Sequence, residues 1–328
     1  STQAKTLFPY TTLFRSDVNV SSKSDRPTNS DTLKVYGPSR GLTGYAQGGA
    51  ITEDCCSVQP IEPAGFIAYQ PAVGNVNDCE LKVQGSSGSG SGPMVIYSDD
   101  KYDSGVTLHS PTLTSTGVAP ALALKVGQGT ASGRVGRGLV VNGGRLQAGT
   151  GHCVSVTGYK ARSLEFSGTV LTNPGAATYR SFLFDATSSV NTLLFRNVAF
   201  DMGAWPATTD QALQIDGAID TLIFDGCTIK GSSSMRFMSL QSGSNVKNVI
   251  FRGCTTDTVD QLVEVQVGAN IVRFEFDGGV YNCIALVKAK VSSCVIVLNP
   301  QTTVNLATGG VMRYDTAATV GTIIDNGV

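Results

Sequence analysis

The chain has 328 residues, of which only 15% are charged and 38 are glycine, and its 24 basic and 25 acidic residues leave a net charge of −1. This balance excludes a strongly basic surface, so we expect no nucleic-acid partner. No run of about 18 apolar residues is present, so we expect no membrane partner, and two histidines in the whole chain disfavour a His-rich metal centre or a Ser-His-Asp triad.

The N-terminal part of the chain differs from the rest. The stretch from Thr6 to Ser16 resembles the one-frame translation of a short-read sequencing adapter, so we interpret residues 1–16 as an artefact of sequence assembly. On this interpretation the native N-terminus, with any signal peptide, is missing; a native strand around Tyr10 is the alternative. Residues 17–78 show no regular period, and we interpret them as an irregular N-terminal cap or the remnant of an upstream module.

A short strand motif recurs from residue 79 onward. The motif has two apolar residues separated by one residue of any type. The second apolar residue is here called the anchor, and Gly or Asn follows two positions after it. The anchors of this first ladder are Phe166, Phe195, Phe224, Phe251 and Phe276, with weaker copies at Val83, Leu108, Val141, Leu298 and Ile323. A second ladder lies between them, with anchors at Tyr97, Leu124, Val156, Phe184, Ile215, Leu240, Val265, Val287 and Tyr314. Successive first-ladder anchors are 22 to 33 residues apart.

Two interleaved sets of strands at one period predict a stack of coils. Each coil would contribute two or three strands that pair in parallel with the next coil, with anchors inward and their neighbours outward. Gly or Asn would adopt the left-handed conformation at each bend. We therefore predict an all-β fold, a right-handed parallel β-helix of about 9–10 coils over residues 79–328. A sandwich or propeller would need hairpin signals, which are scarce, and no helical period supports a doubly wound sheet.

This repeat pattern resembles the pectin-lyase-like parallel β-helix superfamily, which includes phage tailspikes and secreted polysaccharide lyases and hydrolases. The resemblance covers residues 79–328 and rests on the repeat, without any catalytic signature. It implies a polysaccharide ligand, an extracellular or virion location and, as in many tailspikes, a homotrimer.

Two aspartates are the candidate catalytic residues. The residues that directly follow the second-ladder anchors should form an outward row: Asp185, Asp216, Gln241, Gln266 and Lys288. Asp185 and Asp216 would lie one coil apart, roughly 5 Å, which is near the carboxylate separation of retaining glycosidases and would drive their pKa values apart. Glu264 would be a third acid, two to three coils away. The alternative is that both aspartates cap the turns that follow their strands.

Two long connections are candidate substrate-binding loops. Residues 172–181 carry Tyr179 and Arg180, and residues 201–211 carry Trp205 and Asp210. They leave the first ladder at the same corner of adjacent coils, so they should lie side by side. Aromatic faces beside charged groups are typical of sugar-binding sites. The alternative is that Trp205 only shields the stack.

An apolar outward stripe of Leu194, Ile223 and Ile250 precedes the anchors and predicts either a trimer interface or a surface covered by the same chain. The next outward row, Arg196, Asp225, Arg252 and Asp277, predicts a ladder of ion pairs.

Other motifs predict no cofactor or metal. The eight cysteines contain no C-x-x-C, and Cys227 and Cys254 should stack inside the coils. The calcium-like segment 99–105 carries Lys101 at a ligand position. His152 is predicted to be a turn residue rather than a catalytic base.

The function predicted is an extracellular polysaccharide-binding β-helix that resembles a phage tailspike. If it cleaves its ligand, we expect hydrolysis by Asp185 and Asp216. A non-catalytic adhesin and a secreted polysaccharide lyase are the alternatives.

Overall fold

The computed structural model describes residues 105–117, 123–128, 136–148, 151–172, 179–203, 211–291, 294–315 and 322–326, together with the backbone of eight short strands before residue 105. The segment interpreted as adapter-derived, residues 1–16, lies outside these residues.

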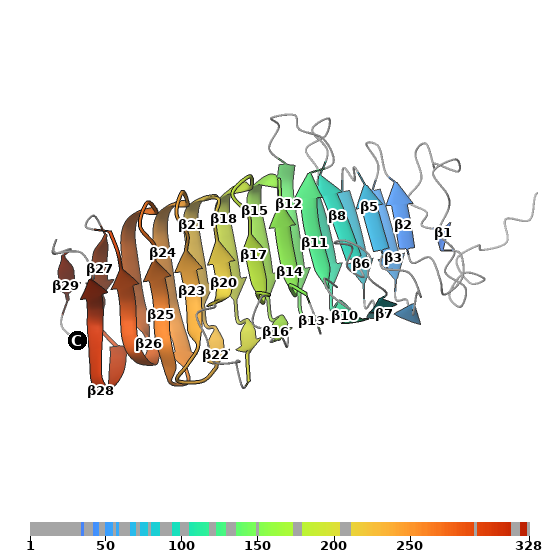
Figure 1. Ribbon diagram of the computed structural model, residues 1–328. Helices are drawn as coiled ribbons and strands as arrows, with labels where there is room; N and C mark the ends of the chain where they lie inside the picture. The colour runs from blue at the N-terminus through green and yellow to red at the C-terminus, as the bar shows by residue number, and fades with distance from the viewer. Residues whose placement is uncertain are drawn as a thin grey trace, which may run out of the picture.

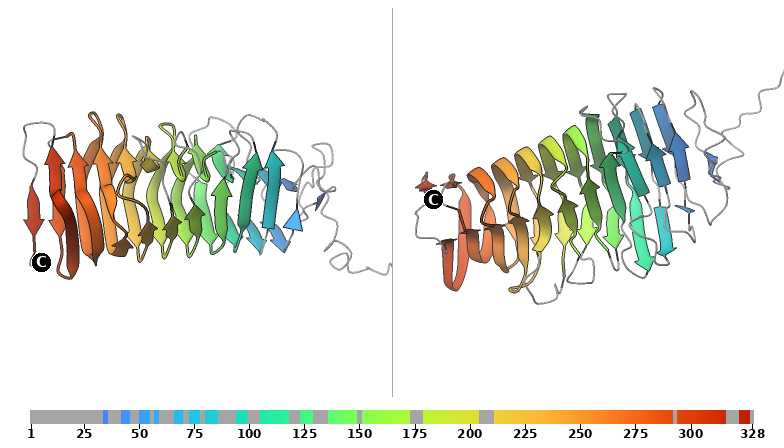
Figure 2. Two further views of the ribbon diagram at one scale, coloured as in Figure 1. Left: turned by 60° about the horizontal axis from the view of Figure 1, so that its bottom comes forward. Right: turned by 45° about the horizontal axis from the view of Figure 1, so that its top comes forward.

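The chain forms a parallel β-solenoid (Figure 1). The described residues are strands and turns, none of them helical, and residues 124–325 make about six turns. No helix in this part of the chain is long and apolar enough to cross a membrane. Figure 2 shows the strands of successive coils running side by side along the stack from the C-terminal strands back toward the N-terminal strands. The all-β solenoid predicted from the repeat is therefore confirmed.

Each coil contributes three strands, so the strands form three ladders. The first ladder contains β9 (Gly105–His109), β12 (Gly136–Asn142), β15 (Lys160–Ser167), β18 (Ser189–Arg196), β21 (Ala218–Asp225), the starts of β24 (Asn245–Thr256) and β26 (Asn270–Ala289), β27 (Val295–Leu298) and β29 (Ile323–Asp325).

A middle ladder follows the first in every coil. It contains β7 (Glu80–Gly85), β10 (Thr112–Gly117), β13 (Arg145–Ala148), β16 (Val170–Thr172), β19 (Ala199–Asp201), β22 (Thr228–Lys230), the end of β24, the middle of β26 and the start of β28 (Thr302–Asp315).

The second ladder completes the coil. It contains β8 (Met94–Ser98), β11 (Leu124–Gln128), β14 (Val154–Thr157), β17 (Phe182–Phe184), β20 (Gln211–Ile215), β23 (Arg236–Leu240), β25 (Val259–Val265) and the ends of β26 and β28.

Six strands lie within the segment that lacks a sequence period. They are β1 (Lys34–Val35), β2 (Leu42–Tyr45), β3 (Ala50–Asp54), β4 (Ser57–Val58), β5 (Phe66–Tyr69) and β6 (Val73–Asn77). Among the described strands only β1 and β2 pair antiparallel; β2 to β6 pair in parallel with strands further along the chain. A domain boundary at residue 79 stays a prediction.

The first-ladder anchors form an aromatic column inside the solenoid. The five predicted phenylalanines are fully buried, and ring centroids of neighbours are 5.4, 5.2, 4.6 and 5.1 Å apart with interplanar angles of 18° or less. Two positions after each anchor the chain turns with positive φ, 63° at Gly168, 51° at Asn197 and 55° at Gly253. Both the inward anchors and the left-handed bends are confirmed, and these bends suit residues that tolerate positive φ.

The predicted register is wrong at several weaker anchors. Val83 pairs with Ser115 in the middle ladder, and Ile323 pairs with Ile296. In the second ladder Leu124 pairs with Val154 rather than Val156, and Val287 pairs with Val263. Tyr97 and Tyr314 pair with Gly127 and Lys288. From Val156 to Val265 the predicted anchors are directly paired.

Candidate functional site

The outward face of the second ladder carries most of the predicted site residues. The register places two rows of side chains on this face, at fixed positions relative to the paired anchors. The row directly after the anchors is Asp185, Asp216, Gln241, Gln266 and Lys290. The row directly before them is Ser155, Leu183, Gln214, Ser239, Glu264 and Lys288. Below, this surface is called the second-ladder face.

One position in the predicted row is wrong. Lys288 pairs with Glu264, whereas the backbone N–H of Lys290 donates to the carbonyl of Val265, so Lys290 ends the row that begins with Asp185. The error follows from the misplaced anchor at Val287, because the paired anchor is Ala289.

Asp216 is a carboxylate of this face whose pKa is shifted by its surroundings. Its two oxygens accept hydrogen bonds of 3.1 and 2.9 Å from Nε2 of Gln214. The carboxylate is partly buried, and this burial raises its pKa above the ordinary value. The charge of Asp185 raises the pKa further, while the Gln214 hydrogen bond and the Arg180 charge oppose the shift. A carboxyl group whose pKa is raised can hold a proton to higher pH, which a general acid requires.

Asp185 lies one coil from Asp216 and is bound to its own turn. Its Oδ1 accepts hydrogen bonds from the backbone N–H of Gly158 at 3.2 Å and of Thr187 at 3.1 Å, and from the Ser188 hydroxyl at 2.7 Å. Its Oδ2 accepts one from the Thr187 hydroxyl at 2.9 Å. Asp185 therefore caps the turn after β17, the role weighed as the alternative to catalysis, and also contributes charge beside Asp216.

Arg180 and Tyr179 lie at the edge of the same face. Arg180 Nε donates to Oε1 of Gln214 at 3.0 Å, and the same oxygen accepts from Nε2 of Gln211 at 3.0 Å. Gln214 thus connects the guanidinium of Arg180 to the carboxylate of Asp216. Trp205 and Asp210, the other predicted substrate-binding residues, lie outside the described residues.

His152 contacts Arg180 and Tyr179, which the sequence analysis did not predict. Its Nδ1 accepts a hydrogen bond of 2.9 Å from the backbone N–H of Arg180, and its ring meets that of Tyr179 edge-on at 5.4 Å. Burial first, and then the Arg180 charge, lower the pKa of His152 to about 4, so the ring is neutral near pH 7. Because Nδ1 is the acceptor, the proton is on Nε2. Strand register could have predicted this contact. His152 and Arg180 each lie four residues before an anchor, and these anchors, Val156 and Phe184, are paired.

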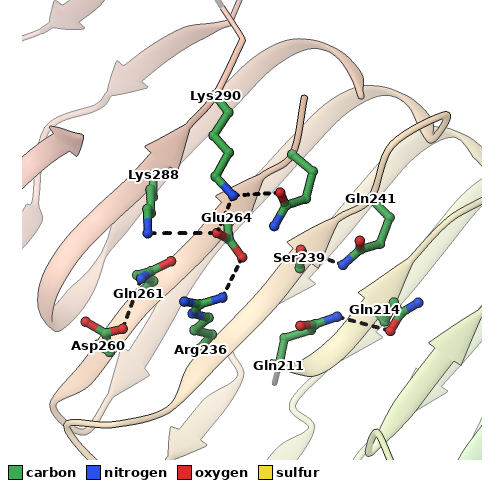
Figure 3. Close-up of polar contacts among 11 residues, drawn as sticks. Gln211, Gln214, Arg236, Ser239, Gln241, Asp260, Gln261, Glu264, Lys288 and Lys290 are labelled. Carbon is green, nitrogen blue, oxygen red and sulfur yellow. Dashed lines mark hydrogen bonds and ion pairs between the residues drawn. The ribbon is translucent and has the colours of Figure 1, made fainter. Parts of the chain in front are cut away.

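Glu264 does not join the two aspartates. It lies two coils beyond Asp216, and its side chain is 1% exposed. Figure 3 shows three cations around its carboxylate: Arg236 Nη1 is 3.1 Å from Oε2, while Nζ of Lys290 and of Lys288 are 3.2 and 3.9 Å from Oε1. A substrate would have to displace these cations before it could reach the carboxylate.

The predicted apolar stripe lies on the outward side of the first ladder. Leu194, Ile223 and Ile250 are directly paired on successive coils and are partly buried. Beside them Arg196 contacts Glu165 and Asp225, each at 3.5 Å, so the start of the predicted ion-pair ladder is present.

Within the described ranges, no group of three or more His, Cys, Asp or Glu side chains is arranged to hold a metal ion. Comparison of the chain with protein-family models, with curated proteins and with solved structures finds no match. The fold is therefore established by the strand pairing, and the resemblance to pectin-lyase-like proteins stays a prediction.

Proposed function

We propose that the second-ladder face binds an extracellular polysaccharide. The row from Asp185 to Lys290 extends over five coils, on the order of 20 Å at the spacing of parallel strands. Amide side chains occupy its centre, with Gln241 Nε2 donating to Ser239 at 3.0 Å (Figure 3). A long row of amide, hydroxyl and charged groups offers a linear sugar polymer donors and acceptors at a regular repeat. Tyr179 at the edge adds an aromatic face for a sugar ring.

We further propose that Asp216 acts as a general acid in hydrolysis of this polysaccharide. The observation that carries the proposal is the raised pKa of a partly buried carboxyl group beside a second carboxylate. Asp216 would give its proton to the glycosidic oxygen, and Asp185 would stabilise positive charge at the sugar carbon or attack it. The hydrogen bonds to both oxygens of Asp185 support a non-catalytic adhesin as the second candidate, because a nucleophile needs a free oxygen.

Product analysis tests the proposal. The protein is incubated with a panel of neutral and acidic bacterial polysaccharides, and new reducing ends, unsaturated products and retention on immobilised polysaccharide are measured. Hydrolysis predicts reducing ends without unsaturation, and Asp216→Asn should lower the rate at least 100-fold while retention persists. Asp220→Asn, an exposed residue paired with Lys247, is the matched control. Retention without cleavage would support the adhesin, unsaturated products would identify a lyase, and neither retention nor products would contradict the proposal.

We also propose that the Leu194–Ile223–Ile250 stripe joins subunits of a homotrimer at the cell exterior or in a virion. Packing of three copies side by side around a threefold axis would cover this apolar stripe, and charges of both signs beside it can pair between copies. Light scattering should give three times the chain mass, and Ile223→Arg should yield monomers. Thr228→Arg, exposed in the middle ladder, should leave the mass unchanged. A wild-type monomer would contradict this assembly.

A further inference from the structure

Cys227 and Cys254 occupy the same position on adjacent coils. Each lies three residues after a stacked anchor, Phe224 or Phe251. The residues that follow them, Thr228 and Thr255, are directly paired, and the Thr255 N–H donates to the carbonyl of Cys227 at 2.9 Å. This register places the two Cα atoms about 4.8 Å apart, the spacing of neighbouring parallel strands.

Both side chains point into the solenoid and meet there. Cys227 is 1% exposed and Cys254 is fully buried. Each thiol donates to the carbonyl of a residue on the preceding coil, at 3.2 Å for Cys227 and 3.4 Å for Cys254. Interaction between the two thiols lowers the pKa of Cys227 and raises that of Cys254. The two side chains therefore influence each other inside the solenoid, and Cys227 has the lower pKa of the pair.

The strand register does not place Cys283 opposite another cysteine. Cys283 pairs with Val259, and Cys294 directly precedes Val295, which pairs with Arg273. Disulfides join residues whose Cα atoms are 4.4 to 6.8 Å apart, and stacked positions on adjacent coils fall in this range. Cys227 and Cys254 meet this condition through direct strand register, because the residues that follow them are paired.

We propose that Cys227 and Cys254 form a disulfide that links two adjacent coils in an oxidising environment. With a small disulfide such as oxidised glutathione, the Cys227 thiolate attacks one sulfur and releases one glutathione thiolate. The Cys254 thiolate then attacks the Cys227 sulfur of the mixed disulfide and releases the second glutathione. The protein loses two protons and two electrons, and one glutathione disulfide becomes two thiols.

The link would stabilise the stack locally. It joins two residues that are 27 positions apart in the sequence, and closing such a segment restricts the unfolded chain. Coils in a solenoid contact only their neighbours, so a covalent bond between two of them opposes their separation. Because both thiols are buried, the bond should form faster during folding than in the folded protein.

Peptide mapping of the full chain tests the proposal. The protein is refolded with oxidised or reduced glutathione, alkylated with iodoacetamide in denaturant and digested with trypsin without reduction. Cleavage after Lys230 and Arg252 places the two cysteines in separate peptides. We expect one linked peptide pair, two hydrogens lighter than the sum, in the oxidised sample only, together with a higher midpoint of urea unfolding than in the reduced sample.

Two variants separate this pair from other cysteines. Cys283→Ala removes a buried cysteine of the same solenoid and should keep the linked peptides, whereas Cys227→Ala should lose them and leave Cys254 alkylated. Wild-type mapping is decisive even if Cys227→Ala fails to fold. Full alkylation of both cysteines after oxidative refolding, or linkage of either to a different cysteine, would overturn the proposal.

Discussion

Replacing Phe251 by alanine tests the aromatic column formed by the first-ladder phenylalanines. The ring of Phe251 stacks on Phe224 at 4.6 Å and 7° and on Phe276 at 5.1 Å and 4°, and meets Tyr281 edge-on at 6.2 Å. Phe→Ala substitutions in protein cores cost about 3–5 kcal/mol. Two stacked pairs, each worth about 0.5–1.5 kcal/mol beyond burial, place Phe251→Ala toward the upper end, about 4–5 kcal/mol.

Urea unfolding followed by circular dichroism measures this cost. With a denaturant dependence of about 3 kcal/mol per molar urea, the midpoint should fall by roughly 1.5 M. Arg252→Ala is the matched control, because Arg252 is the next residue, points outward and is exposed. Its effect should stay within about 0.5 kcal/mol.

Two outcomes would refute the assignment of Phe251 to the column. One is a loss of less than about 1.5 kcal/mol for Phe251→Ala, well below the range for a buried ring. The other is equal losses for Phe251→Ala and Arg252→Ala. A lower denaturant dependence in Phe251→Ala alone would instead indicate that the stack separates at this coil, as nearest-neighbour contacts allow.

Three further predictions follow from particular contacts. A Cβ on Gly217 would lie 2.4 Å from two backbone carbonyl oxygens, whereas a Cβ on Gly253 would meet nothing within 4 Å. Gly217→Ala should therefore abolish or severely impair folding, while Gly253→Ala should cost only about 1 kcal/mol of backbone strain. The midpoints of urea unfolding of the two variants measure this difference. The pKa of His152 falls from 6.5 to about 4 on folding, so the unfolded chain binds an extra proton between these pH values. The free energy of unfolding should therefore fall by at most about 3 kcal/mol as pH drops from 6.5 to 4. His152→Asn should flatten this dependence on pH, and an unchanged dependence would contradict the burial of a neutral His152. Glu264→Gln leaves three cations around a neutral group, so we expect a loss of about 3 kcal/mol; a loss no larger than that of the more exposed Glu275→Gln would show that the cluster does not depend on this charge.

The solenoid could be predicted because its signals are local. Alternation of apolar residues over five positions, followed by Gly168, Asn197 or another residue that accepts positive φ, is read within one strand and its turn. The repetition of that signal at one period then implies stacking. Phenylalanine anchors are large enough to specify the register, and from Phe166 to Phe276 the predicted alignment is correct.

The roles of the candidate catalytic residues depended on contacts between coils. Nothing in the sequence around Asp185 shows that Gly158, 27 positions earlier, donates to its carboxylate. Likewise, the burial of Glu264 follows from cations that come from neighbouring coils. Such contacts depend on which residues lie opposite each other, which local patterns leave open.

The amino-acid sequence alone determined the fold class, the inward faces of the strong strands and the position of the bends. Tertiary structure decided the third strand of each coil and the register at weak anchors. Val287 and Ala289 are both apolar and two residues apart, so either can point inward, and a shift by two preserves the alternation of faces. Only pairing with Val263 and Val265 selects between them, and that choice places Lys290, rather than Lys288, in the row of Asp185 and Asp216.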